Sequence, residues 1–170
     1  MKNVKDQLTL LEDTLVSEFR CLQKMVEITH KENTVLLMGN SSILMPILED
    51  KETILDQVIM YEEQRTMVCE ELARVFGINA QPPTVKSLLP HLDPAMADRI
   101  RRLCDGIVAL SEQQDDLNLQ VNTLSQSWIE LIHSTQAYLL SFYQSPAAYV
   151  PPGVRQGLNL PPVWGTEHRA

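Results

Sequence analysis

Apolar residues recur along the chain in alternating steps of three and four, which is the spacing of one face of an α-helix. The first stripe predicts a helix over residues 3–38. It consists of Val4, Leu8, Leu11, Leu15, Phe19, Leu22 and Val26. Directly after it, the run Gly39-Asn40-Ser41-Ser42 supplies a glycine for a helix end and several candidate N-caps. We therefore expect a tight turn into a second long helix.

The second helix is predicted over residues 42–76, with Pro46 tolerated only in its first turn. Two basic residues, Lys51 and Arg65, interrupt an otherwise apolar seam. Their methylene stems can lie on the seam while their charges reach acidic neighbours such as Glu62. The seam positions are Ile47, Lys51, Ile54, Val58, Tyr61, Arg65, Val68, Leu72 and Val75.

Residues 77–93 have the composition of a linker. Gly77 and the pair Pro82-Pro83 end the second helix, and a short helix is expected over residues 84–89, stopped by Pro90. Asp93-Pro94 is a helix start, because an N-cap acceptor precedes a proline whose φ is already helical.

The strongest pattern predicts a third long helix over residues 94–143. Only two of its fourteen seam positions are polar, and they are Gln114 and Thr135. The seam runs through Met96, Ile100, Leu103, Ile107, Leu110, Gln114, Leu117, Val121, Leu124, Trp128, Leu131, Thr135, Tyr138 and Phe142. At 1.5 Å per residue, such a helix is about 75 Å long.

These elements predict an all-α fold: an elongated antiparallel helical hairpin plus a third long helix, forming a three-helix coiled-coil-like bundle. The bundle domain is expected over residues 1–143. Residues 144–170 hold five of the ten prolines and three of the six glycines, so an irregular, flexible Pro-rich C-terminal tail is expected there.

The charge balance excludes several classes of partner. Twenty-two acidic and fourteen basic residues give a net charge of −8, which disfavours binding to nucleic acid or to an anionic membrane surface. Apolar runs are too short for membrane insertion, and the N-terminus does not resemble a signal peptide. Three widely spaced cysteines form neither a disulfide framework nor a zinc set. We expect a reduced protein of the cytoplasm.

Little in the sequence indicates catalysis. No nucleotide-binding glycine loop or nucleophile motif is present, so the chain is not expected to be an enzyme or to need a cofactor. Two Glu-x-x-His units, Glu27–His30 and Glu130–His133, have the spacing of half a di-iron site. However, the helical register turns His133 about 160° away from the seam, which favours surface residues over metal ligands. His30-Lys31 is faintly similar to a phosphotransfer histidine, with an ordinary surface histidine as the simpler interpretation.

Three further features leave alternatives open. The acidic pairs along the helices are either solvated faces or one side of a groove that steers a basic partner segment. Trp128 is either a core residue or part of a binding site. Trp164, in the tail, either contacts a partner or folds back onto the bundle.

One stretch of the chain resembles a known family. It reads Glu32-Asn33-x-x-Leu36-Leu37-x-Gly39-Asn40, followed by Leu44, Ile47, Asp50-Lys51-Glu52, Leu55, Val58, Tyr61-Glu62 and Arg65. Together with Leu88-Leu89 and Asn122-Thr123-Leu124, it is similar to the flagellar export chaperones of the FlgN family over roughly residues 8–153. The chain differs from the family in having Asn40 where Asp is common, and in its longer, more proline-rich tail.

The resemblance implies a cytosolic type III flagellar export chaperone. Such a protein binds C-terminal segments of hook-filament junction (hook-associated) proteins, prevents their premature assembly and delivers them to the export apparatus. It implies a monomer or weak homodimer. The alternative is a structural coiled-coil subunit or adaptor without chaperone activity.

A client that must stay unassembled needs a long apolar helical face on which an amphipathic segment can lie. We expect this face on the C-terminal half of the third helix and in the tail. Seam residues there could instead pack on the first two helices, so the exposure of the off-seam residues Ile132 and Leu139 is the better indicator. The predicted client-binding residues are Leu124, Trp128, Leu131, Ile132, Tyr138, Leu139, Phe142, Tyr149 and Trp164.

Overall fold

The computed structural model describes residues 4–79 and 82–144. The chain divides into two compact units, residues 1–129 and residues 130–170. The described residues contain helices and no strand, which confirms the predicted all-α class. The predicted tail, residues 144–170, lies outside the described residues except for Gln144, so the division into bundle and tail stays a prediction.

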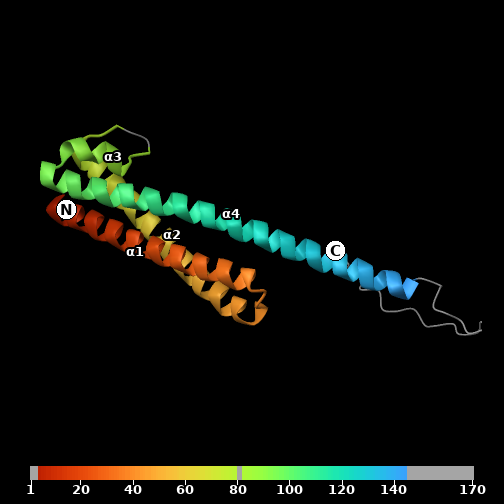
Figure 1. Cartoon of the computed structure of the whole chain (residues 1–170). Helices are drawn as coiled ribbons and strands as arrows, with labels where there is room; N and C mark the ends of the chain where they lie inside the picture. Colours follow the sequence, from red (N-terminus) through yellow and green to blue (C-terminus); the bar gives the residue numbers. More distant parts are fainter. Residues whose placement is uncertain (1–3, 80–81, 145–170) are drawn as a thin grey trace, which may run out of the picture. The chain divides into compact units, whose positions relative to one another are not determined.

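Helices α1 (Val4–Leu37) and α2 (Leu44–Phe76) form an antiparallel hairpin (Figure 1). Their side-chain contacts show the direction, because Gln7 meets Glu71 whereas Glu32 meets Lys51. The turn between them has Gly39 at φ +65°, a left-handed conformation that glycine adopts without strain. A 3₁₀ turn, Ser41–Ile43, then leads into α2, so that Pro46 lies in the first turn of α2.

A short connector follows α2. Gly77 caps α2 with φ +68°, and α3 (Val85–Leu88) begins with a capping box in which the side chains of Thr84 and Ser87 each accept from the other's backbone N–H. Pro90 follows the end of α3 at Leu88, which is one residue short of the expected helix end at residue 89. It lies near the start of a 3₁₀ helix, Leu89–His91, where a missing N–H costs little because the first N–H groups of a helix have no intrahelical partner.

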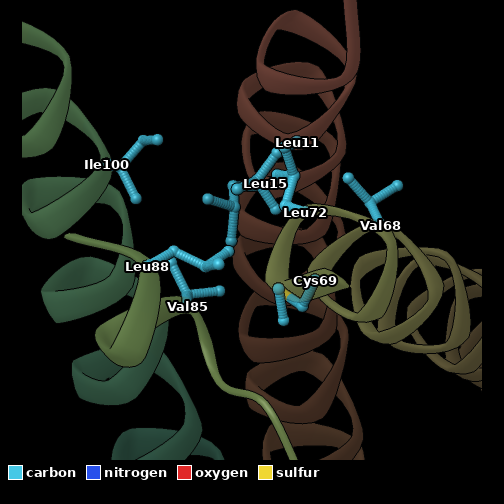
Figure 2. Close-up of a cluster of buried hydrophobic side chains, with 9 residues drawn as sticks. Leu11, Leu15, Val68, Cys69, Leu72, Val85, Leu88 and Ile100 are labelled. Atoms are coloured by element: carbon cyan, nitrogen blue, oxygen red, sulfur yellow. The ribbon is translucent and has the colours of Figure 1, made fainter. Parts of the chain in front are cut away.

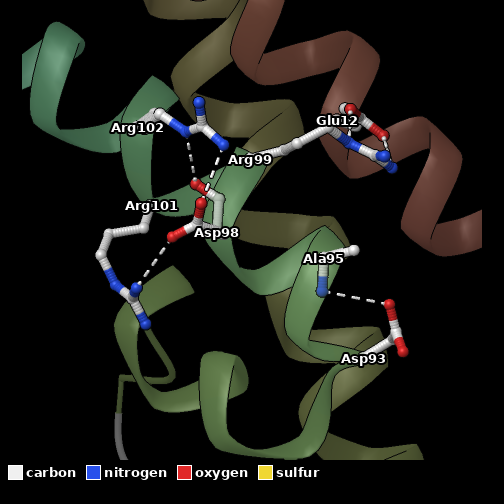
Figure 3. Close-up of polar contacts among 7 residues, drawn as sticks. All are labelled: Glu12, Asp93, Ala95, Asp98, Arg99, Arg101 and Arg102. Atoms are coloured by element: carbon white, nitrogen blue, oxygen red, sulfur yellow. Dashed lines mark hydrogen bonds and ion pairs between the residues drawn. The ribbon is translucent and has the colours of Figure 1, made fainter.

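The last helix, α4, spans Pro94–Gln144. Figure 3 shows its start, where the carboxylate of Asp93 accepts from the backbone N–H of Ala95 at 3.2 Å. One turn further, Arg99 Nε donates to Glu12 of α1 at 2.9 Å. Later contacts pair Thr29 with Gln114 and Asn33 with Gln120. Since the residue numbers of the partners on α1 and on α4 rise together, α4 runs parallel to α1 within the first unit.

The core of the first unit lies at the end of the bundle where all four helices meet (Figure 2). Leu11, Leu72, Leu88 and Ile100, one from each helix, are fully buried. Burying side chains of this size contributes about 1.5–3 kcal/mol each. The whole cluster comprises Leu11, Leu15, Val68, Cys69, Leu72, Ala73, Val85, Leu88 and Ile100.

Helix α1 packs on both neighbours, so it is buried on more than the one stripe predicted. The close approach of α4 depends on Gly106, because a Cβ at this position would lie 2.7 Å from a ring carbon of Phe19. On α2 the predicted seam ends early: Val75 is 54% exposed, and the partly buried Phe76 packs on the core instead. Positions seven residues apart on a straight helix do not lie exactly above one another. The buried face therefore moves from the predicted Val75 to Phe76 at the end of α2.

Candidate functional site

The interface between α1 and α2 contains two buried carboxylates that the sequence pattern did not indicate. Arg65 Nε donates to Glu18 Oε2 at 2.9 Å, and Lys51 Nζ donates to Glu32 Oε2 at 2.6 Å. Glu18 and Glu32 are 2% and 6% exposed. Arg65 also contacts Glu62 at 3.5 Å, the neighbour expected from the sequence. The two seam cations therefore fix the register of the hairpin through carboxylates on the facing helix.

Burial affects the titration of Glu18. Desolvation raises the pKa of its carboxyl above the ordinary value, although the Arg65 guanidinium acts in the opposite direction. Burial also raises the pKa of the Cys69 thiol to about 11. A thiol with this pKa has very little nucleophilic thiolate at neutral pH. Cys69 is therefore a core residue rather than a reactive one.

A second polar layer connects α1 to α4. Gln114, the polar seam residue of α4, is 8% exposed and donates from Nε2 to Thr29 Oγ1 at 2.8 Å. It also donates to Asn118 Oδ1 at 3.1 Å, and this oxygen accepts from Lys51 Nζ at 3.3 Å. The network joins all three long helices, which explains how a glutamine is accommodated on an apolar seam.

Trp128 contacts the turn between α1 and α2. Its indole N–H donates to the Leu36 carbonyl in the last turn of α1 at 3.0 Å, and the same oxygen accepts from the Gly39 backbone N–H at 3.1 Å. A Cβ at Gly39 would lie 3.1 Å from the Trp128 ring. With 38% of its surface exposed, this tryptophan has a defined packing role and still presents part of its ring to solvent.

The predicted client-binding residues that lie on α4 after residue 129 are all exposed. Leu131, Ile132, Tyr138, Leu139 and Phe142 have between 52% and 62% of their surface accessible, and we call these five residues the client face. Tyr138 and Phe142 form an edge-to-face ring pair with centroids 4.7 Å apart, a favourable aromatic geometry. Such a concentration of large apolar groups on a helix is typical of an interaction surface.

The remaining predicted residues differ in their placement. Leu124 is half-buried in the first unit, whereas Tyr149 and Trp164 lie outside the described residues. Ile129 and Leu140, which were not predicted, are also exposed, at 47% and 56%. They lie off the seam of α4, so a search for heptad positions does not find them.

The two Glu-x-x-His units lie on exposed helix surface, with all four side chains in the exposed class. Within residues 4–79 and 82–144, no group of three or more His, Cys, Asp or Glu side chains is arranged to hold a metal ion. None of the described helices has the length and apolarity needed to cross a membrane.

A comparison with known protein families shows to which family the chain is related. The model of the family described as FlgN protein matches residues 1–156. The chain belongs to the FlgN family. The FlgN family is a family of flagellar chaperones. No curated protein and no solved structure matches the chain. The FlgN match begins at residue 1, before α1, covers every described helix and ends within residues 145–170.

Proposed function

We propose that this FlgN-family protein is a cytoplasmic export chaperone. In this proposal it binds the C-terminal segments of hook-associated proteins, prevents their premature assembly, and delivers them to the flagellar type III export apparatus. The observation that supports this function best is the exposed client face of α4 in a chain of this family. No nucleotide or metal chemistry is needed, because holding a segment requires only surface that competes with its self-assembly.

The physical argument rests on the apolar area of α4. Each large apolar side chain of the client face leaves about half or more of its surface in water, and covering such surface yields roughly 25 cal/mol per Å². An amphipathic client helix can cover it by lying along α4 as an added helix. Half-buried Leu124 and partly exposed Trp128 occupy preceding seam positions of the same helix. Tyr149 and Trp164 follow in sequence.

The test replaces two apolar residues of the client face that lie off the seam. In the variant Ile132→Glu/Leu139→Glu, two carboxylates would have to be desolvated when the client docks. We expect the affinity for a hook-associated protein, measured by isothermal titration calorimetry, to fall at least tenfold. Since both residues are about half exposed, the helical circular dichroism of the free protein should be unchanged.

The matched control is Gln126→Glu/Ala137→Glu, which adds the same charge to exposed positions of α4 on the side away from the client face. It should bind the client as the wild type does. Equal affinity of both double variants would contradict the proposed face. A stable oligomer in sedimentation, independent of concentration and without client binding, would instead support the structural coiled-coil alternative.

A further inference from the structure

The first unit has an apolar groove that the client face does not include. It lies where α1, α2 and α4 meet and has a volume of about 320 Å³. Leu48 and Leu55 on its α2 side are 36% and 48% exposed, so apolar surface inside the groove faces water. The lining residues are Leu22, Met25, Leu48, Lys51, Glu52, Leu55, Val58, Gln114 and Asn118.

One polar atom in this groove has unused hydrogen-bonding capacity. The side chain of Gln114 is more than nine-tenths buried and donates twice from Nε2. Its Oε1 accepts no hydrogen bond from any residue in the described part of the chain. A buried acceptor without a donor costs about 1–3 kcal/mol.

The charge around the groove is acidic. Glu52 lines it, Asp56 follows Leu55 on α2, and Asp115 follows Gln114 on α4. Among the described residues none of these three carboxylates is in an ion pair. Lys51, the one cation lining the groove, is neutralised by Glu32.

Cations on the neighbouring helices do not offset this charge. Arg20, Lys24 and Lys31 are exposed on α1, at roughly 100° to 180° around the helix from Leu22 and Met25 at 100° per residue. Helix α4 has no lysine or arginine after Arg102. The groove therefore combines an apolar floor and acidic edges.

We infer that this groove binds a basic amphipathic helix of a partner protein. Apolar side chains of that helix enter between Leu48, Leu55 and Met25, and lysines or arginines on its flanks meet Glu52, Asp56 and Asp115. This is helix-in-groove recognition with electrostatic complementarity. The inference does not depend on the proposed client face, because it concerns different residues and a partner of defined charge.

The probe is a fluorescein-labelled synthetic helix of 18 residues with leucines on one face and lysines on the other. A second peptide carries glutamates in place of the lysines. Fluorescence anisotropy with the full chain should show the lysine peptide binding at least tenfold tighter than the glutamate peptide, with weaker binding at high salt. Equal binding of the two peptides would overturn the inference.

A groove variant separates docking from general attraction to an acidic protein. Leu55→Glu adds a negative charge, which would strengthen non-specific binding of the lysine peptide, yet we expect affinity to fall at least tenfold because the apolar contact is lost. The control Leu119→Glu adds the same charge at a position on α4 that is 66% exposed and outside the groove. It should keep the wild-type affinity. Loss of affinity in both variants, or in neither, would overturn the inference.

Three further outcomes would assign the surface differently and overturn the inference. Loss of peptide binding in Ile132→Glu/Leu139→Glu with retention in Leu55→Glu would place the peptide on the client face. A tenfold gain of affinity in Trp164→Ala would identify the chain's own residues 145–170 as the occupant. A dimer seen in sedimentation that Leu55→Glu dissociates would identify a second copy. Intact client binding by Leu55→Glu keeps this test separate from that of the proposed function.

Discussion

Glu18 has a carboxyl whose pKa depends on two opposing effects, its own burial and one neighbouring guanidinium. It is 2% exposed and has Arg65 as its one ion-pair partner among the described residues. Desolvation outweighs that partner and raises the pKa of the carboxyl. The folded protein therefore binds this proton more tightly than the unfolded chain does, and the Glu18 contribution to stability is lost as the pH rises from the ordinary pKa through the raised one.

The direction of this pH dependence gives a prediction for the variant Glu18→Gln, which has no carboxyl to titrate at this position. The free energy of unfolding of the variant minus that of the wild type should increase as the pH is raised from about 4 to 7, measured by urea denaturation. In an Arg65→Met background the opposing guanidinium is absent, so the same difference should change more steeply. A difference that is independent of pH in both backgrounds would contradict the assignment.

Gly39 is the residue at which the hairpin turn and α4 constrain each other. Its φ of +65° is costly for any residue with a Cβ, by about 1–2 kcal/mol. A Cβ here would also lie 3.1 Å from the Trp128 ring. Gly77 has nearly the same φ, but a Cβ there would meet nothing within 4 Å.

The two glycines form a matched pair for mutation. Gly77→Ala should destabilise by about 1 kcal/mol through φ alone, and Gly39→Ala should destabilise further because Trp128 must move. Thermal unfolding measures both values. The excess at Gly39 should disappear in a Trp128→Ala background, and equal effects of the two substitutions in the wild type would show that the ring does not constrain the turn.

At the scale of helices, the packing of α4 against α1 depends on a missing side chain. Replacing a helical glycine by alanine ordinarily stabilises by about 1 kcal/mol. At Gly106 the new methyl group would lie 2.7 Å from the Phe19 ring, so the gain should be lost. In a Phe19→Ala background, Gly106→Ala should recover a stabilisation of up to about 1 kcal/mol.

The coupling energy of this double-mutant cycle, obtained from urea denaturation, measures the contact between the two helices. We expect a coupling of about 1 kcal/mol. Simple additivity of Gly106→Ala and Phe19→Ala would mean that the ring moves aside at no cost.

The helices could be predicted from the sequence because their signals are local. Period, glycine C-caps and the Asp93-Pro94 start depend only on neighbouring residues, and the structure places the long helices accordingly. The second buried stripe of α1 could not be predicted, because it contains polar residues such as Glu18 and Thr29 that resemble a solvated face. Their burial depends on Arg65 of α2 and Gln114 of α4, which are partners distant in sequence.

The candidate site could likewise be predicted from the sequence only in part. The apolar positions of the client face follow from the seam of α4 and its off-seam neighbours, but periodicity does not tell whether a seam is covered. Val121 and Leu131 are both seam positions of α4, yet Val121 is buried and Leu131 is more than half exposed. The groove was missed because its lining comes from three helices, and no single stretch of sequence contains it.

At the scale of the molecule, the proposed chaperone function includes residues 145–170. Tyr149 and Trp164 are large apolar groups in a proline-rich stretch of sequence, and buried aromatic anchors commonly dominate binding energy. Deleting residues 145–170 should weaken binding of the hook-associated client about tenfold or more in isothermal titration calorimetry. Trp164→Ala should reproduce much of this loss, and Gln156→Ala should not. Wild-type affinity after the deletion would remove these residues from the site.

The scarcity of cations on α4 determines how contacts with this helix can be mapped. Between Arg102 and Arg155 the chain offers neither a cleavage site for trypsin nor an amine for a lysine-directed cross-linker. Trypsin protection and amine cross-linking therefore report on α1, α2, the connector and, for trypsin, the first turns of α4. They give no signal from the client face, whether or not a client is bound. Proteases that cut beside aromatic residues, with Tyr138 and Phe142 as their targets, can detect a client there.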